Sequence, residues 1–180
     1  MKQIIIISHE PLTIRTKKIF LIEDFIHQGF SLQYWDMSQY FHPGIKLSDE
    51  LNKEEYVKKI DSLNDIKLHL NKINTSKVLF IVEVFNNKWK NRHFFKLLKE
   101  NKCFVIQIEL YATAMLPIPF TIKLKYSKAI TIFNYLKNRI LSVAFYIYKK
   151  INNFECYDLA FTSNKLTARC KNVIPINHPD

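Results

Sequence analysis

Short apolar segments alternate with amphipathic segments along most of this chain. Gln3–Ser8 is β-branched and apolar on both faces, which is typical of a central strand covered by helices on either side. Arg15–Gln28 instead repeats its apolar residues every three or four positions, the spacing of an amphipathic helix, and Gly29 follows as a stop. Ser31–Asp36 supplies the next strand. The opening part of the chain therefore predicts a βαβ crossover.

The same alternation continues to the end of the sequence. Further strands are predicted at 56–60, 77–85, 103–110, 157–163 and 172–176, helices at 62–73, 89–100 and 128–151, and loops at 37–47 and 111–120. Repeated strand–helix units favour a Rossmann-like α/β domain, with a largely parallel sheet of about six or seven strands. Helices on both faces of this sheet would make three layers, α/β/α. A chain of 180 residues is long enough for one such core.

Basic residues are concentrated in the second half of the chain. The whole chain has 27 Lys and Arg against 16 Asp and Glu, a formal net charge of +11. Residues 1–76 contain ten of each sign, so 77–180 hold the remaining seventeen basic and six acidic residues. Such a surface suits an anionic membrane, nucleic acid or a phosphorylated substrate, although an ordinary solvated Lys-rich surface has the same composition.

Several classes of site lack their signature in this sequence. Gly29 and Gly44 are the two glycines, so neither the GxGxxG dinucleotide fingerprint nor the GxxxxGK[ST] P-loop occurs. Cys103, Cys156 and Cys170 are odd in number and widely spaced, which favours a reducing cytoplasm over a disulfide framework or a CxxC metal site. The six histidines show no HxxxH or HxH spacing, so no metal site is predicted and a metal-dependent hydrolase is disfavoured.

The long helix predicted at 128–151 is amphipathic and basic. Lys137 and Arg139 interrupt its apolar run, which excludes it as a membrane-spanning segment. Two interpretations stay open: in-plane association with an anionic membrane, or packing on the core with a solvated basic side. The expected apolar face comprises Ile132, Phe133, Leu136, Ile140, Val143, Ala144 and Ile147. The residues predicted to face a membrane are Lys137, Arg139, Phe145, Tyr148, Lys149 and Lys150.

Polar residues at the ends of predicted strands are the candidate site residues. His9 and Glu10 follow the first strand, where an imidazole can take a proton from an acceptor hydroxyl. A loop-capping histidine and a solvated glutamate are the alternative. Glu83 and Glu109 lie near the ends of apolar strands, so each needs an opening onto a cleft or an ion-pair partner. Thr113, in the following loop, is a further candidate for this cleft.

The end of the chain resembles the closing segment of the N-terminal domain of GT-B glycosyltransferases. In that superfamily a strand ending in Ser precedes a short helix, and a further strand leads into a hinge turn. YDLAFTS at 157–163 and NVIPINHPD at 172–180 follow this order, with Asn177 and His178 at the hinge and His178-Pro179 replacing the usual Gly and its neighbour. His9-Glu10-Pro11 and the segment YWDMSQYF also look like transferases from bacterial capsule and lipopolysaccharide clusters.

The resemblance implies that residues 1–180 are one domain, the acceptor-side half of a two-domain enzyme truncated at its hinge. This half would bind a glycan or lipid-linked acceptor, and its own C-terminal domain would hold a nucleotide-sugar donor. No cofactor is then expected in this chain, which should be inactive alone and lie in the cytoplasm, at the inner face of the membrane. The glycine-rich loop usual after the first strand is missing. The alternative function is a non-catalytic basic α/β module that binds nucleic acid or another polyanion.

Overall fold

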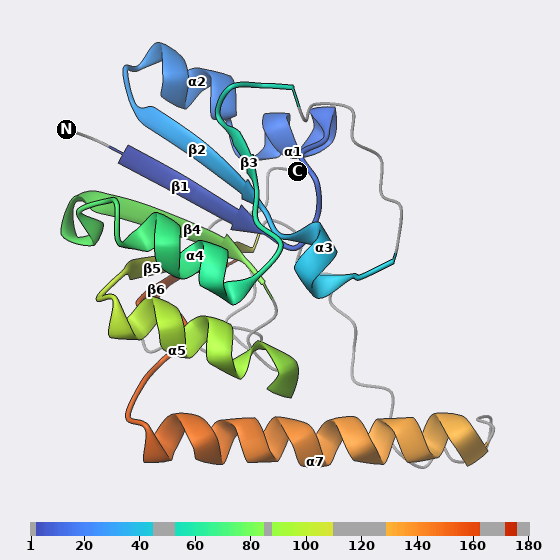
Figure 1. Cartoon of the computed structure of the whole chain (residues 1–180). Helices are drawn as coiled ribbons and strands as arrows, with labels where there is room; N and C mark the ends of the chain where they lie inside the picture. Colours follow the sequence, from blue (N-terminus) through green and yellow to red (C-terminus); the bar gives the residue numbers. More distant parts are fainter. Residues whose placement is uncertain (1–2, 45–52, 85–87, 110–128, 163–171, 176–180) are drawn as a thin grey trace.

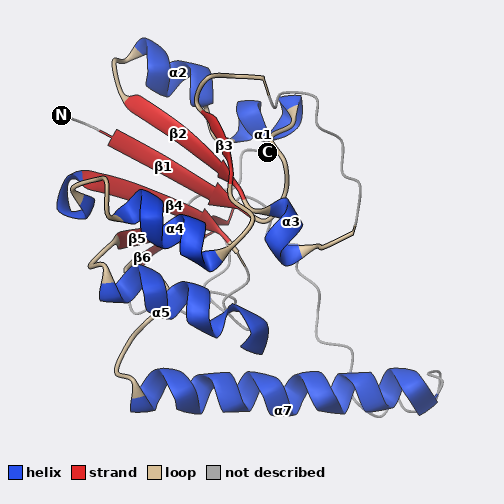
Figure 2. Ribbon diagram, viewed as in Figure 1, coloured by secondary structure: helices blue, strands red, loops and turns tan. Residues whose placement is uncertain are grey.

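A seven-stranded sheet in which every pairing is parallel forms the framework of the protein (Figures 1 and 2). This computed structural model describes residues 3–44, 53–84, 88–109, 129–162 and 172–175. The strands are β1 (Gln3–Ser8), β2 (Ser31–Asp36), β3 (Val57–Lys59), β4 (Val78–Glu83), β5 (Phe104–Glu109), β6 (Leu159–Thr162) and β7 (Val173–Pro175). Their order across the sheet is β3-β2-β1-β4-β5-β6-β7. The predicted Rossmann-like α/β class is confirmed.

The helices between the strands are short except for the last. In the described ranges they are α1 (Ile14–Ile19), α2 (Ile22–His27), α3 (Ser38–Phe41), α4 (Leu63–Leu70), α5 (Arg92–Glu100) and α7 (Ala129–Ile151), with 3-10 turns η1 (Thr75–Lys77) and η2 (Trp89–Asn91). Ser62 caps α4 as predicted, since its Oγ accepts a hydrogen bond of 3.1 Å from the amide of Asp65. In Figure 1, α7 runs below α5 at the bottom of the molecule.

β1 lies in the middle of the sheet because both of its faces are apolar. Its four isoleucines are at most 2% exposed, and the strand pairs with β2 on one side and β4 on the other. Successive side chains point to opposite faces, so Ile5 and Ile7 enter one core and Ile4 and Ile6 enter the other.

Helices contribute to both of these cores. On the Ile5 face they supply the buried side chains of α4, α5 and α7, namely Ile66, Leu70, Phe94, Phe95, Leu98 and Phe145. On the opposite face, Phe20 and Ile22 from the α1–α2 segment pack against β1 and β2. The expected three-layer arrangement is therefore present.

Two elements differ from the sequence prediction. The helix expected over 15–28 is broken at Leu21, which adopts a left-handed conformation with φ of 49°. On a straight helix, Phe20 and Ile22 would point about 200° apart, whereas the break lets both side chains enter the core. The loop expected over 37–47 contains the short helix α3, because Phe41 is buried and Asp36 accepts a hydrogen bond from the amide of Ser38.

An ion pair connects α5 to the strand that follows α7. Lys99 on α5 donates to one carboxylate oxygen of Asp158, and the other accepts from the amide of Val105 at 2.8 Å. The amide of Asp158 in turn donates to the carbonyl of Val105 at 2.7 Å. The side chain and the backbone amide of Asp158 therefore align the start of β6 with β5.

Candidate functional site at the carboxyl edge of the sheet

Three neighbouring strands end in polar residues at the same edge of the sheet. Ser8 ends β1 and lies opposite Asp36 of β2 and Glu83 of β4 in the strand pairing. Ligands of open parallel α/β sheets bind outside the carboxyl ends of the strands. We call the residues at this edge the strand-end cluster: Ser8, His9, Glu10, Asp36 and Glu83.

Ser8 connects the members of the cluster. Its side chain is fully buried, and its hydroxyl donates to Oε2 of Glu83 at 3.1 Å while accepting from the amide of Glu10 at 3.1 Å. The hydroxyl therefore fixes both the carboxylate at the end of β4 and the turn after β1. Sequence reasoning missed Ser8, although a polar residue that closes an apolar strand is the same signal that identified Glu83.

Burial perturbs the protonation of the Glu83 carboxyl group. The residue is exposed overall, but protein atoms crowd its carboxyl and raise its pKa above the ordinary 4.5. The hydrogen bond from Ser8 and the nearby charge of His9 lower the pKa in part, and the charge of Glu10 raises it. The prediction left a cleft or an ion-pair partner open. Among the described residues, the hydroxyl of Ser8 donates a hydrogen bond to the carboxylate of Glu83.

His9 is oriented by the backbone of β4. Its Nδ1 lies 2.6 Å from the carbonyl oxygen of Glu83. A carbonyl oxygen can only accept, so Nδ1 carries the hydrogen, and in the neutral ring Nε2 is the basic nitrogen. Nε2 lies 3.7 Å from Oε1 of Glu10. The carboxylate of Glu10 is therefore the charged group that lies beside Nε2.

The turn that carries Glu10 is held from β2. The hydroxyl of Tyr34 donates to the carbonyl of Glu10 at 2.9 Å. Burial raises the pKa of Tyr34, so this hydroxyl stays protonated and remains a donor. The side chain of Glu10 is 63% exposed and points away from the core, next to His9. The backbone of Glu10 is thus fixed while its carboxylate stays in contact with solvent.

Asp36 has a structural role, and it brings a second histidine to the site. Its carboxylate is almost fully buried and accepts from the amide of Ser38 at 2.8 Å, which starts α3. His42 follows α3, and its ring centroid lies 5.6 Å from that of His9. Neither Asp36 nor His42 was a candidate from the sequence, because α3 itself was not predicted.

The remaining candidates for the cleft and hinge do not join the cluster. Glu109 ends β5 and pairs through its backbone with Thr162 of β6. In the strand order, β4 separates β5 from β1, so Glu109 is on the same edge but two strands from His9. Thr113, Asn177 and His178 lie outside the described residues.

The residues predicted to face a membrane divide between two sides of α7. Phe145 is 1% exposed and belongs to the core, so the expectation that it faces outward is wrong. Tyr148 is half-buried, with its ring centroid 5.7 Å from that of Trp89. The apolar surface beneath α7 takes up these two rings. Among the basic residues, Lys137, Arg139 and Lys150 are exposed, and Lys149 is half-buried with Nζ 3.4 Å from Glu155.

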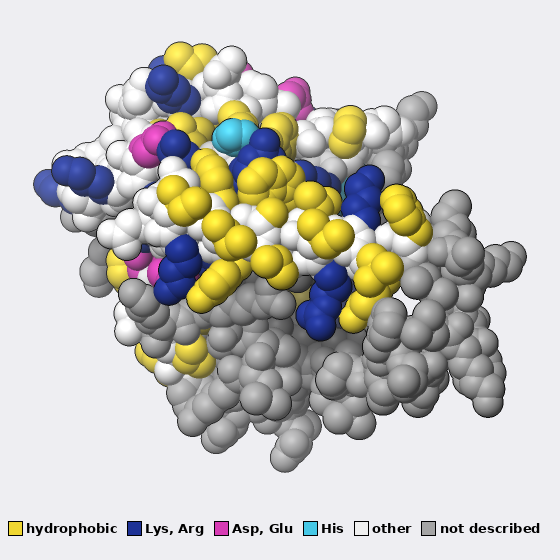
Figure 3. Space-filling view, turned by 90° about the horizontal axis from the view of Figure 1, so that it is seen from below, with side chains coloured by type: hydrophobic (Ala, Val, Ile, Leu, Met, Phe, Trp, Pro, Cys, Tyr) yellow, Lys and Arg dark blue, Asp and Glu magenta, His cyan; other side chains and the backbone are white. Residues whose placement is uncertain are grey.

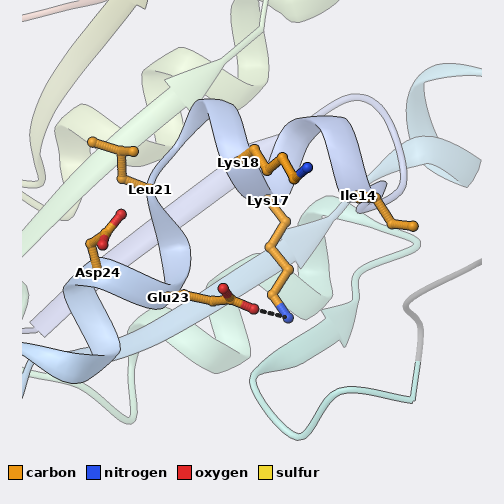
Figure 4. A pocket seen from close by; sticks show the side chains of 6 residues that line it. All are labelled: Ile14, Lys17, Lys18, Leu21, Glu23 and Asp24. Carbon is orange, nitrogen blue, oxygen red and sulfur yellow. Dashed lines mark ion pairs between the residues drawn. The ribbon is translucent and has the colours of Figure 1, made fainter.

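A separate cavity of about 410 Å³ lies at the α1–α2 segment (Figure 4). It is half-open, and Ile14 and Leu21 contribute its exposed apolar lining. Nζ of Lys17 lies 3.1 Å from Oε1 of Glu23 and 3.3 Å from Oε1 of Glu54. Both carboxylates raise the pKa of Lys17, and Glu23 has the larger effect. Lys17 and Lys18 are matched in the cavity lining by Glu23 and Asp24, so the formal charges of the lining cancel.

The fold and the strand-end cluster define a class: a Rossmann-like α/β protein whose carboxyl sheet edge holds a histidine between a backbone carbonyl of β4 and the carboxylate of Glu10. No protein-family model and no curated protein matches the chain. In the described ranges, no three His, Cys, Asp or Glu side chains are grouped so that they could hold a metal ion.

Proposed function

We propose that this chain is the acceptor-side domain of a GT-B-type glycosyltransferase-like protein in bacterial surface polysaccharide biosynthesis. A C-terminal domain would hold the nucleotide-sugar donor, and a glycan or lipid-linked acceptor would bind at the strand-end cluster. The proposal assigns the protein to the cytoplasm, where nucleotide sugars are available. Its supports are the parallel α/β fold and the resemblance of segments 157–163 and 172–180 to the hinge region of that superfamily.

The orientation of His9 is the observation that carries this proposal. The hydrogen bond from Nδ1 to the carbonyl of Glu83 makes Nε2 the proton acceptor at the edge where open α/β sheets bind ligands. In the proposed transfer, the acceptor oxygen bonds to the anomeric carbon of the sugar as its proton moves to Nε2. The bond from that carbon to the nucleoside diphosphate breaks, and the electron pair leaves with the diphosphate.

The two neighbouring glutamates would assist His9 in different ways. Glu10 would place a negative charge beside the imidazolium formed in the transfer, since Oε1 lies 3.7 Å from Nε2. Glu83 would keep the ring in position through its backbone carbonyl, while its side chain is held by Ser8. His9 is then the general base, and Ser8 and Glu83 are positioning residues.

The experiment that tests the proposal combines imidazole NMR with binding of saccharides to the chain. We expect the ¹⁵N spectrum at neutral pH to show His9 as the Nδ1–H tautomer. Acceptor-type oligosaccharides should shift its Nε2 resonance, and nucleotide sugars should not. His9→Gln should abolish the saccharide-induced shifts at the strand ends, whereas His27→Gln, on the exposed end of α2, should preserve them.

Three results would contradict the proposal. An Nε2–H tautomer of His9 would remove the proposed base. Sugar transfer by the 180-residue chain alone would contradict the division between two domains. Salt-sensitive binding of RNA or DNA without any saccharide binding would instead favour a polyanion-binding module.

A further inference from the structure

One side of α7 is an exposed apolar stripe. We call it the α7 stripe; its members recur every three or four residues and are 46–78% exposed: Phe133, Leu136, Ile140, Val143, Ile147 and Ile151. Figure 3 shows hydrophobic side chains in a band along this side of the molecule, with Lys and Arg at its borders. Six neighbouring apolar side chains in water form the kind of surface patch that marks an interaction site.

The opposite side of α7 holds the stripe in this outward orientation. Phe145 is buried in the core, and the ring of Tyr148 lies 5.7 Å from Trp89 and 6.1 Å from Phe154. Rotation of the helix to bury the α7 stripe would withdraw Phe145 from the core. The stripe is therefore a fixed feature of the surface.

The charges of α7 indicate what covers the stripe. The helix contains no acidic residue and four basic ones, of which Lys137, Arg139 and Lys150 are exposed. The spacing of the stripe also fits a helix pair, but a second copy would bring eight basic residues together with no acidic partner in either helix. An anionic lipid surface neutralises these charges and accepts the apolar side chains.

We propose that α7 docks the protein on an anionic lipid bilayer, with the helix lying in the plane of the membrane and the α7 stripe inserted among the acyl chains. At 23 residues α7 is about 35 Å long, and a helix whose outward face is apolar with basic borders is typical of in-plane binding. No helix in the described part of the chain is long and apolar enough to cross a bilayer. This inference does not rest on the proposed function.

Co-sedimentation with lipid vesicles tests the inference. The 180-residue chain should sediment with vesicles of equal parts phosphatidylcholine and phosphatidylglycerol at low salt, and far less with phosphatidylcholine alone. Ile140→Ser combined with Lys137→Glu should weaken binding to the anionic vesicles by at least about tenfold, because one inserted side chain and two units of charge are lost. The matched control, Leu68→Ser with Lys67→Glu on α4, changes two exposed residues elsewhere and should bind like the wild type.

Several results would overturn the inference. They are a failure of the wild-type chain to sediment with anionic vesicles, equal binding to neutral vesicles, and equal loss of binding in both double variants. A dimer in ultracentrifugation that Ile140→Ser dissociates would assign the stripe to a second copy instead. Circular dichroism confirms that each variant is folded before it is scored. No sugar is used, so failure here is distinct from failure of the acceptor-site test.

Discussion

α5 and α7 are both basic amphipathic helices on the same face of the sheet, yet α7 leaves far more apolar surface exposed than α5 does. α5 buries Phe94, Phe95 and Leu98 in the core and leaves its charged residues outside. Among the described side chains of α7, Phe145 is the one that is fully buried, and a row of apolar residues lies in solvent. Among the helices that cover this face, α5 behaves as an ordinary core helix and α7 does not.

The difference comes from how much of each helix is apolar. α5 has one apolar side, so only one orientation buries it. α7 is apolar on more than one side, and the core beneath it has room for only one of them. Periodicity therefore identified the apolar stripe of α7 but left open whether it packs on the core or faces outward; in the structure most of its residues are exposed. An apolar stripe that stays exposed after another side of the helix has packed on the core is a better sign of a partner than amphipathicity alone.

The largest effect is expected for Phe95→Ala on α5. Phe95 is fully buried and its ring centroid lies 5.1 Å from that of Phe94 and 5.4 Å from that of Tyr157. Removing the ring leaves a cavity, and the free energy of unfolding should fall by about 3–5 kcal/mol, measured by urea denaturation. A loss below about 1 kcal/mol would mean that the interior beneath α5 is loosely packed, and the contrast with α7 would weaken.

An intermediate effect is expected for Cys103, which follows α5 in the same core. Burial raises the pKa of its thiol from the ordinary 9.0 to about 12. Below pH 9.0 the thiol is protonated in both states; above it the unfolded chain loses the proton while the folded protein retains it, so stability falls as the pH rises towards 12.

The urea stability of wild type and Cys103→Ala should therefore converge as the pH rises from below 9.0 towards 12. Ionisations shared by the two proteins cancel in this difference. A constant difference across that range would show that the thiolate forms as easily in the folded protein as in the unfolded chain, and that the core under α5 is open to water.

The smallest effect is expected for Phe133→Ala on the α7 stripe. Phe133 is 66% exposed, so losing its ring should change the free energy of unfolding by no more than about 0.5 kcal/mol. The substitution is chemically identical to Phe95→Ala, which makes the pair a direct comparison of the two helices. A loss similar to that of Phe95→Ala would indicate that Phe133 is covered in solution, by a second copy or by another part of the protein.

Local patterns predicted much of the fold and part of the site. The bounds of β1 and β2, the cap at Ser62 and the stop at Gly29 follow from short-range rules, and Gly29 has the positive φ, 78°, expected after a helix. The break at Leu21 and the helix α3 were missed. Both depend on which side chains fit into the core, and the neighbouring residues in the sequence do not determine that.

The candidate site shows the same division. His9, Glu10 and Glu83 were identified one by one, as polar residues at strand ends. Their association was not predicted, because it requires β1 and β4 to pair in the register that sets Ser8 opposite Glu83, 75 residues away. The tautomer of His9 depends on the same pairing, since the carbonyl that fixes it belongs to β4.

By itself, the sequence determined the order of the strands, the parallel α/β class and the excess of positive charge, since composition and periodicity act over a few residues at a time. Only the tertiary structure decided which residues meet at the carboxyl edge and which side of α7 faces outward. Strand register and the shape of the core are set by contacts between distant segments. The same pattern of residues is compatible with more than one such set of contacts.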